Sequence, residues 1–294
     1  MSDEQRPHQA RRGARWPRLV PRNRREWLFA LFRLAVLLAL FSVVMTMLAH
    51  RLLHYPDQYS LAELERMISR TSLAAWPSPA DPRGLLVAPS GPLPPAGTVA
   101  IFHGNAGSAA DRTYYAQALL PLGFRVVLLE YPGYGARLGG LGEDELYRDA
   151  VESLQAIRTT WGRPLVVLGE SLGAAVAAGA VFRLSGQVDG VVLITPWDDL
   201  PTVAQSIYWF LPARWLVPER YDSVAHLRAF PGPLAVVVAG RDEIIPKACS
   251  ERLFRTYSGR GRIIHIDGAG HNTWYDQTDR GWWRELMSFV TSAP

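Results

Sequence analysis

The 294-residue sequence predicts an α/β protein: a mostly parallel, doubly wound sheet with a small helical cap, preceded by one transmembrane helix. Short runs rich in Val, Ile and Leu alternate with longer helical patterns over most of residues 98–294. One long interval in this alternation is rich in aromatic residues, and a long apolar stretch near the N-terminus lies outside it.

Positive charge is confined to an N-terminal tail. The formal charge of the chain is +4, but eight arginines against three acidic residues give residues 1–26 a net charge of +5, which leaves −1 for the rest. The body of the protein therefore offers no broad surface for phosphate groups, and we expect no nucleic-acid partner.

Residues 27–49 form an apolar run that predicts a membrane anchor. Its 23 residues would measure about 34 Å as a helix, against about 30 Å for the hydrocarbon core of a bilayer. Arg33, its only charge, lies near the arginine-rich end, where the side chain can reach lipid headgroups. A cleaved signal peptide is the alternative, but the run is longer than the usual apolar region and lacks a clear cleavage site.

The arginines before this run also predict its orientation. Basic residues flanking a span favour the cytoplasmic side, so we expect a cytoplasmic N-terminus. The rest of the chain would then lie on the non-cytoplasmic side, which is periplasmic or extracellular in a bacterium.

Residues 50–97 connect the apolar run to the body. Residues 56–70 have helical spacing of apolar side chains after Ser60, a predicted N-cap, with Glu63 three positions later. This amphipathic helix could lie on the membrane or pack on the domain. The proline-rich residues 76–97 predict turns, with a strand at 83–89.

Residues 98–294 predict the main domain. Runs continuous in Val, Ile and Leu are typical of parallel strands covered on both faces. We expect strands at 98–104, 125–131, 164–170, 189–196, 233–240 and 262–268, and helices at 109–121, 142–161, 171–185, 246–258 and 278–291. Residues 197–230 are longer than a crossover needs, which predicts an inserted cap. Its aromatic residues could line a ligand site, pack the cap to the body, or do both.

The segment Gly169-Glu170-Ser171-Leu172-Gly173 predicts a nucleophile. It follows a strand and opens a helix rich in small residues, the setting of a sharp strand–turn–helix elbow. The bare G-x-S-x-G pattern is weak, because it arises often by chance, but this context is specific. An ordinary N-cap serine is the structural alternative.

A serine nucleophile needs a base and an acid that orients the base. Asp242 follows the strand at 233–240, and His271 follows the strand at 262–268, so both are expected at the same edge of the sheet as Ser171. Glu243, Asp198 and Asp199 are rival acids. Asp242 could instead cap a turn, and His271 could be structural.

Acyl transfer also needs donors for the oxyanion. We expect the backbone N–H of Leu172 to be one and that of Asn105, or else Ala106, to be the other, because the segment 103–108 follows the strand at 98–104. His103 is expected to brace this loop. No residues at ligand spacing predict a metal, and we expect no cofactor.

Six motifs in residues 99–291 resemble the α/β-hydrolase superfamily: HGNAGS, LLEYPGYG, LGESLGAAVA, ITPWDDL, GRDEIIP and GAGHN. Together with the N-terminal apolar run, they are most similar to the membrane-anchored α/β-hydrolase domain-containing serine hydrolases. The resemblance implies Ser171, Asp242 and His271 as a catalytic triad with a backbone oxyanion hole. It also implies activity on lysophospholipids, monoacylglycerols or protein-bound acyl groups, without selecting one.

The expected function is hydrolysis of carboxylic esters or thioesters through an acyl-enzyme on Ser171, with lipid-like or acylated substrates beside a bilayer. An amidase, peptidase or acyltransferase with the same triad is one alternative. A non-catalytic membrane scaffold with this fold is the other. The sequence leaves the oligomeric state open.

Overall fold

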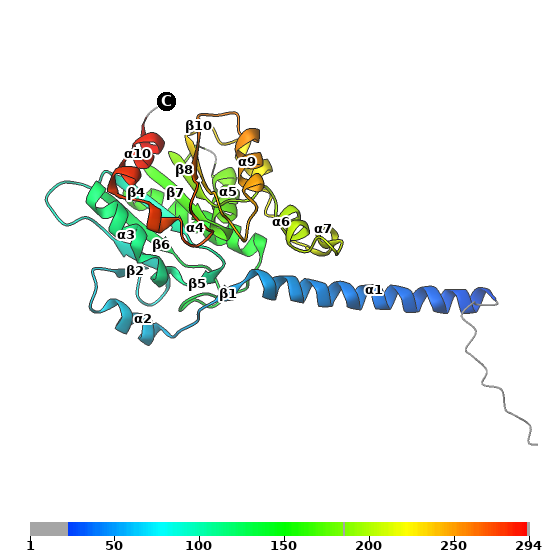
Figure 1. The fold of residues 1–294 in the computed structure, drawn as a ribbon. Coiled ribbons are helices and arrows are strands. Elements are labelled where there is room, and N and C mark those ends of the chain that lie inside the picture. Colours follow the sequence, from blue (N-terminus) through cyan, green and yellow to red (C-terminus); the bar gives the residue numbers. More distant parts are fainter. Residues whose placement is uncertain (1–22, 185, 293–294) are drawn as a thin grey trace, which may run out of the picture. The chain divides into compact units, whose positions relative to one another are not determined.

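The computed structural model describes residues 23–184 and 186–292 (Figure 1). Residues 1–22, most of the predicted basic tail, lie outside the described part. The chain divides into two units, residues 1–44 and residues 45–294. The second unit is globular and carries the sheet.

Helix α1 (Arg24–Leu53) contains the predicted span. Among the described residues, it is the one helix long and apolar enough to cross a bilayer, and none of its most apolar window is buried in protein. The helix crosses the boundary between the units, so residues 45–53 belong to the globular unit. It is therefore a candidate anchor whose last turns are part of the main domain.

The main sheet has the strand order β10-β9-β8-β7-β4-β6-β3-β2. Its strands are β2 (Ala74–Pro77), β3 (Pro82–Val87), β4 (Gly97–Phe102), β6 (Phe124–Leu129), β7 (Leu165–Glu170), β8 (Gly190–Ile194), β9 (Leu234–Ala239) and β10 (Gly261–Ile266). From β6 to β10 all neighbours are parallel, and only β3 runs against its neighbours. The predicted doubly wound, mostly parallel sheet is confirmed.

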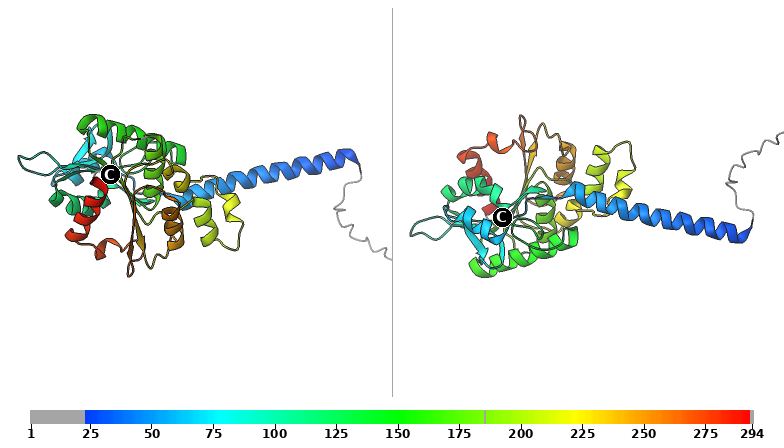
Figure 2. Two further views of the ribbon diagram at one scale, coloured as in Figure 1. Left: turned by 90° about the horizontal axis from the view of Figure 1, so that it is seen from above. Right: turned by 90° about the horizontal axis from the view of Figure 1, so that it is seen from below.

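Helices cover both faces of this sheet, as its apolar strands require. Figure 2 shows α4 (Glu143–Trp161; green) and α10 (Arg280–Thr291; red) on opposite sides of it. Successive strand residues alternate between the two cores: Val167 packs with α4, α5 (Leu172–Arg183) and α9 (Lys247–Thr256), whereas Val166 packs with α3 (Thr113–Leu119) and α10. Short 3-10 turns complete this layer: η1 (Ala109–Arg112), η2 (Leu120–Leu122) and η3 (Tyr275–Gln277).

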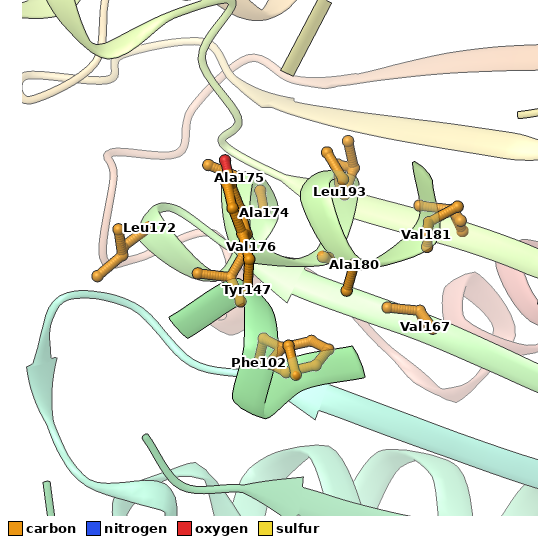
Figure 3. Close-up of a cluster of buried hydrophobic side chains, with 14 of the residues drawn as sticks. Phe102, Tyr147, Val167, Leu172, Ala174, Ala175, Val176, Ala180, Val181 and Leu193 are labelled. Atoms are coloured by element: carbon orange, nitrogen blue, oxygen red, sulfur yellow. The ribbon is translucent and has the colours of Figure 1, made fainter. Parts of the chain in front are cut away.

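Small side chains let α5 approach the sheet closely. Its residues are buried from Leu172 to Val181. Figure 3 shows Val176 and Ala180 of this helix beside Tyr147 of α4, with Phe102 of β4 nearby. The start of α5 is thereby held rigidly at the carboxyl end of β7.

The segment after α1 is tied into the globular unit by a short second sheet. Strand β1 (Tyr55–Pro56) pairs in parallel with β5 (Ala106–Gly107). The N–H of Tyr55 donates to the Asn105 carbonyl at 2.9 Å, and the N–H of Asp57 donates to the Gly107 carbonyl at 3.0 Å. The chain leaving α1 is therefore hydrogen-bonded to the loop that follows β4.

Helix α2 (Leu61–Ile68) has the predicted capping box, with Ser60 and Glu63 bonded to each other's backbone N–H groups. Leu64 is buried in the core on the α3–α10 side of the sheet. Of the two predicted places for this helix, the structure has it packed on the domain.

The interval between β8 and β9 holds α6 (Leu200–Ile207), α7 (Ala213–Leu216) and α8 (Ser223–Leu227). Figures 1 and 2 show α6 and α7 (yellow-green) standing out from the layers around the sheet. We call residues 197–230 the cap. Its aromatic residues fall into separate groups: Trp197 and Tyr221 are buried, whereas Trp209, Phe210 and Trp215 are exposed.

Candidate active site

Ser171 occupies the sharp turn between β7 and α5, with φ +55° and ψ −116°. A non-glycine residue at positive φ is strained and persists only where the surroundings enforce it. The surroundings here are tight: a Cβ on Gly173 would overlap the carbonyl oxygens of Phe102 and His103, and one on Gly169 would overlap the Gly173 carbonyl oxygen. Only glycine fits at these two positions, which is the physical basis of the G-x-S-x-G pattern.

The structure brings Ser171, His271 and Asp242 together in one hydrogen-bonded chain. His271 Nε2 lies 3.0 Å from Ser171 Oγ, and His271 Nδ1 lies 2.8 Å from Asp242 Oδ2. A carboxylate only accepts, so the imidazole proton is on Nδ1, and the Nε2 lone pair faces the serine hydroxyl. Ser171 and His271 are 6% and 4% exposed, so bulk water screens these bonds weakly.

Asp242 is itself held in place by its own loop. Its Oδ1 accepts the backbone N–H groups of Ile244 at 3.0 Å and Ile245 at 2.7 Å. These bonds satisfy the carboxylate and fix the face that it presents to the imidazole.

The rival acids contact other groups. Glu243 accepts the backbone N–H of His271 at 3.1 Å and does not contact its ring. Asp198 binds Arg252 at 2.7 Å, and Asp199 caps α6 through the N–H of Thr202. The geometry therefore favours Asp242 as the partner of the imidazole.

The loop after β4 lies against the serine. A Cβ on Gly104 would be 3.7 Å from the Ser171 Cβ. His103 Nδ1 donates to the Gly104 carbonyl at 2.7 Å, and the Asn105 N–H belongs to the same peptide plane and points the opposite way. His103 is thus a bracing residue that fixes the direction of one predicted oxyanion donor. Leu172, the other predicted donor, is the first residue of α5.

The loop after β6 braces the same peptide groups. Tyr131 Oη donates to the His103 carbonyl at 2.6 Å, and Tyr134 Oη donates to the Asn105 carbonyl at 2.8 Å. The Glu130 carboxylate lies 2.9 Å from His103 Nε2 and accepts the N–H of Ala109 at 3.0 Å. Burial raises the pKa of both tyrosines well above the usual value, so they remain donors. The sequence pattern alone assigns no role to Glu130, Tyr131 and Tyr134. They directly follow β6, which pairs with β4, and this pairing brings them beside the loop after β4.

The side chain of Glu170, the residue before Ser171, connects two elements of the fold. Its carboxylate accepts the hydroxyls of Tyr114 at 2.8 Å and Tyr115 at 2.7 Å. Burial, followed by the negative charge of Glu170, raises the pKa of both tyrosines. These bonds join the end of β7 to α3.

A cavity of about 480 Å³ opens onto this site. Ser171, His271 and Asn105 are among the residues that line it. Apolar residues from α1 and from the cap form its walls, among them Met45, Leu48, Leu52, Val203, Ile207 and Leu216. Among the described residues that line it, Glu219 is the one acidic residue. The cavity lining thus combines a few polar residues with many apolar side chains suited to hydrocarbon.

Within the two described ranges, no group of three or more His, Cys, Asp or Glu side chains is arranged to hold a metal ion.

Comparison with known proteins agrees with the fold. Residues 94–224 match the Hydrolase_4 family model, described as serine aminopeptidase, S33. Est1E of Butyrivibrio proteoclasticus, solved with ferulic acid bound, superposes with a TM-score of 0.61 at 14% identity, covering 75% of this chain and 96% of that one. The sheet order, the elbow and these matches show that the chain has the α/β-hydrolase fold.

Two curated relatives are more similar in sequence. An uncharacterized protein of Mycobacterium tuberculosis is 35% identical over 177 residues, which cover 59% of this chain and 62% of the relative. Lysophosphatidylserine lipase ABHD12 of Danio rerio is 28% identical over 171 residues, covering 52% of this chain and 45% of the lipase. The chain thus spans less than two thirds of the length of either relative.

Proposed function

We propose that the protein is a serine hydrolase that cleaves carboxylic esters or thioesters of acyl substrates beside a membrane. The observation that carries the proposal is the hydrogen-bonded chain Ser171–His271–Asp242 at the floor of an apolar cavity. A serine hydroxyl is a weak nucleophile, and this chain supplies the base and the orienting acid that it needs.

In the first step, Ser171 Oγ attacks the acyl carbonyl carbon while His271 Nε2 takes the hydroxyl proton. Asp242 stabilises the imidazolium that forms. The tetrahedral intermediate collapses when His271 gives its proton to the leaving oxygen or sulfur atom, which leaves the acyl group on Ser171. Water then attacks the acyl-enzyme, His271 takes a proton from it, and the acid departs as the proton returns to Ser171.

The backbone N–H groups of Leu172 and Asn105 are the proposed oxyanion donors. The bond from His103 to the Gly104 carbonyl supports this role for Asn105, because it sets the direction of that N–H before substrate binds. A donor that needs no rearrangement stabilises the developing charge most effectively, and losing one commonly costs about 3 kcal/mol.

The cavity walls support an acyl substrate. Leu52 and Val203 are among the apolar side chains available to a hydrocarbon chain, and burying each methylene contributes about 0.8 kcal/mol. The similarity to a protein named as a lysophosphatidylserine lipase agrees with lipid-like substrates.

We also propose that α1 anchors the protein in a bilayer, with the N-terminus in the cytoplasm and the site on the other side. The length and exposure of α1 support the anchor, and the arginines that precede it support the orientation. A reporter at the C-terminus should be inaccessible from the cytoplasm. Reporter activity on the cytoplasmic side would contradict the proposed orientation.

A fluorophosphonate probe tests the catalytic assignment on the full-length protein in detergent micelles. The wild type should be labelled and should hydrolyse short acyl esters, whereas Ser171→Ala should do neither. Ser258→Ala, at an exposed serine in the loop before β10, is the matched control and should behave as wild type. Labelling that survives Ser171→Ala would refute the assignment, and a folded wild type with neither labelling nor turnover would indicate the non-catalytic scaffold.

Peptide cleavage is the second candidate, favoured by the description of the matching family as serine aminopeptidase. Competition of acyl esters, thioesters and peptides with a free amino terminus against the fluorophosphonate probe distinguishes ester hydrolysis from peptide cleavage. Stronger protection by peptides than by esters would favour the peptidase.

A further inference from the structure

The cap carries a cluster of exposed apolar side chains that the proposed chemistry does not use. Trp209, Phe210 and Trp215 are 78%, 65% and 81% exposed, and Ile207 and Leu211 are also exposed. We call these five residues the cap tip. Single exposed apolar residues are ordinary on a protein surface, but a cluster of large ones marks a surface that contacts something else.

The composition around the cap tip suits a lipid headgroup region. Residues 200–218 contain no acidic residue, and Arg214 is their only charge. The Arg214 guanidinium lies 5.9 Å from the centre of the Trp215 ring. Tryptophan is enriched where one end of a side chain meets hydrocarbon and the other meets water, and arginine can extend to lipid phosphates.

The position of the cap tip supplies the second observation. Ile207 and Leu211 line the same cavity as Met45, Leu48 and Leu52 near the end of α1. If α1 spans a bilayer, chain connectivity alone puts these last turns near the membrane surface. Side chains that share a cavity wall with them then lie within reach of the same interface.

We propose that the cap tip is a second membrane-contact surface, which inserts Trp209, Phe210 and Trp215 into the boundary between headgroups and acyl chains. This rests on the proposed anchoring by α1. Amphipathic surfaces of this kind lie about 5 to 10 Å deep in the interface. Because the cap tip borders the cavity, its insertion places the mouth of the cavity against lipid, and an acyl chain reaches Ser171 without crossing water.

The test uses the full-length protein in nanodiscs of phosphatidylcholine and phosphatidylglycerol, in a Cys249→Ala background. A cysteine is introduced by Trp215→Cys and labelled with an environment-sensitive fluorophore, and quenching by spin-labelled lipids is measured. Leu93→Cys is the exposed control, from the loop before β4, at the amino end of that strand. Val36→Cys in α1 is the membrane reference.

Quenching at position 215 should exceed that at position 93 by at least about twofold, because only the former lies at interfacial depth. Equal quenching at the two positions would overturn the proposal. So would a blue-shifted but unquenched fluorophore at 215, which would mean that a second copy of the chain covers the cap tip. Loss of quenching at position 36 as well would overturn the anchor and the cap tip together.

A second measurement separates this surface from the catalytic assignment. Neither Trp209 nor Trp215 lines the cavity, so the double variant Trp209→Ser, Trp215→Ser should hydrolyse a short soluble ester as the wild type does. Its turnover of an acyl lipid in the nanodisc should fall about tenfold or more, since the variant lacks two aromatic side chains that would insert into the lipid interface. Unchanged turnover of the lipid would contradict the proposal, and the quenching result stands whether or not Ser171 is catalytic.

Discussion

The Tyr134 hydroxyl donates a 2.8 Å hydrogen bond to the carbonyl oxygen of Asn105, which joins the loop after β6 to the loop after β4. The same carbonyl accepts the N–H of Tyr55, from the segment that follows α1. Three distant parts of the sequence thus meet at one peptide group beside Ser171. The N–H of Ala106 belongs to this peptide plane, so its direction is set by the two donors.

Tyr134→Phe should therefore lower kcat about fivefold and leave KM nearly unchanged. The variant removes the hydrogen bond to the Asn105 carbonyl, worth about 1 kcal/mol, and with it the longer 3.3 Å contact between the hydroxyl and His54 Nδ1. The first of these bonds positions the loop after β4, which carries the proposed oxyanion donor. Tyr257→Phe is the control, since Tyr257 also donates to a carbonyl, that of Gly232, before β9 and away from the site. Equal losses in both variants, or a change in KM alone, would show that Tyr134 only stabilises the fold.

Asp242→Asn should reduce kcat by about 10⁴-fold with little loss of stability. An amide can donate to Nδ1, which favours the imidazole tautomer that carries its proton on Nε2 and cannot accept from Ser171. Glu243→Gln should cost less than about tenfold, because Glu243 bonds the His271 backbone and not its ring. Steady-state kinetics of the two variants decide between these acids, and a larger loss at Glu243 would reverse the assignment.

Ala204→Phe should shorten the range of acyl chains that the enzyme accepts. Ala204 lies on α6 and lines the cavity, so the added ring takes up space that a long chain needs. We expect kcat/KM for a sixteen-carbon ester to fall about tenfold more than for a four-carbon ester. Probe labelling at the wild-type rate serves as the control for folding. An equal loss of kcat/KM for both esters would show that the acyl chain does not lie beside Ala204.

Cys249 should resist alkylation in the folded protein. Burial, followed by the nearby carboxylate of Asp198, raises the pKa of its thiol to about 12. A raised thiol pKa means less of the reactive thiolate, so only about one molecule in ten thousand is thiolate at pH 8. Mass spectrometry after iodoacetamide should find Cys249 modified only after denaturation, whereas a cysteine placed at the exposed Leu93 should react in the native state. Rapid native modification of Cys249 would show that α9 opens readily.

The positions of the parallel strands along the chain could be predicted, because each is a short run that is continuous in apolar residues. Apolar runs such as that of β9 are unambiguous where both faces are covered, and Ser171, Asp242 and His271 each follow such a run. Their roles as nucleophile, acid and base remain predictions for the kinetics above. Strand-end positions converge at one edge of a parallel sheet, so neighbours in space could be expected from residues far apart in sequence.

The rest depends on tertiary packing that no local pattern encodes. The apolar residues Met45 and Leu48 predicted only a membrane segment, because their sequence pattern cannot say which side chains line a cavity of the globular unit. Likewise, the aromatic residues of the cap looked equivalent in sequence, but Tyr221 is buried and Trp215 is exposed. The bracing by Tyr134 required the pairing of β6 with β4, which places the two loops side by side.

The pairing of β1 with β5 ties the residues directly after α1 to the loop beside Ser171. A flexible tether of several residues would let a soluble head drift and rotate above the lipid surface. Here Leu53 ends α1, and Tyr55 is already hydrogen-bonded to the loop beside Ser171. Cutting the chain directly after α1 would therefore remove residues that line the cavity, and a fragment beginning after Pro56 would also lose a hydrogen bond that supports the loop after β4.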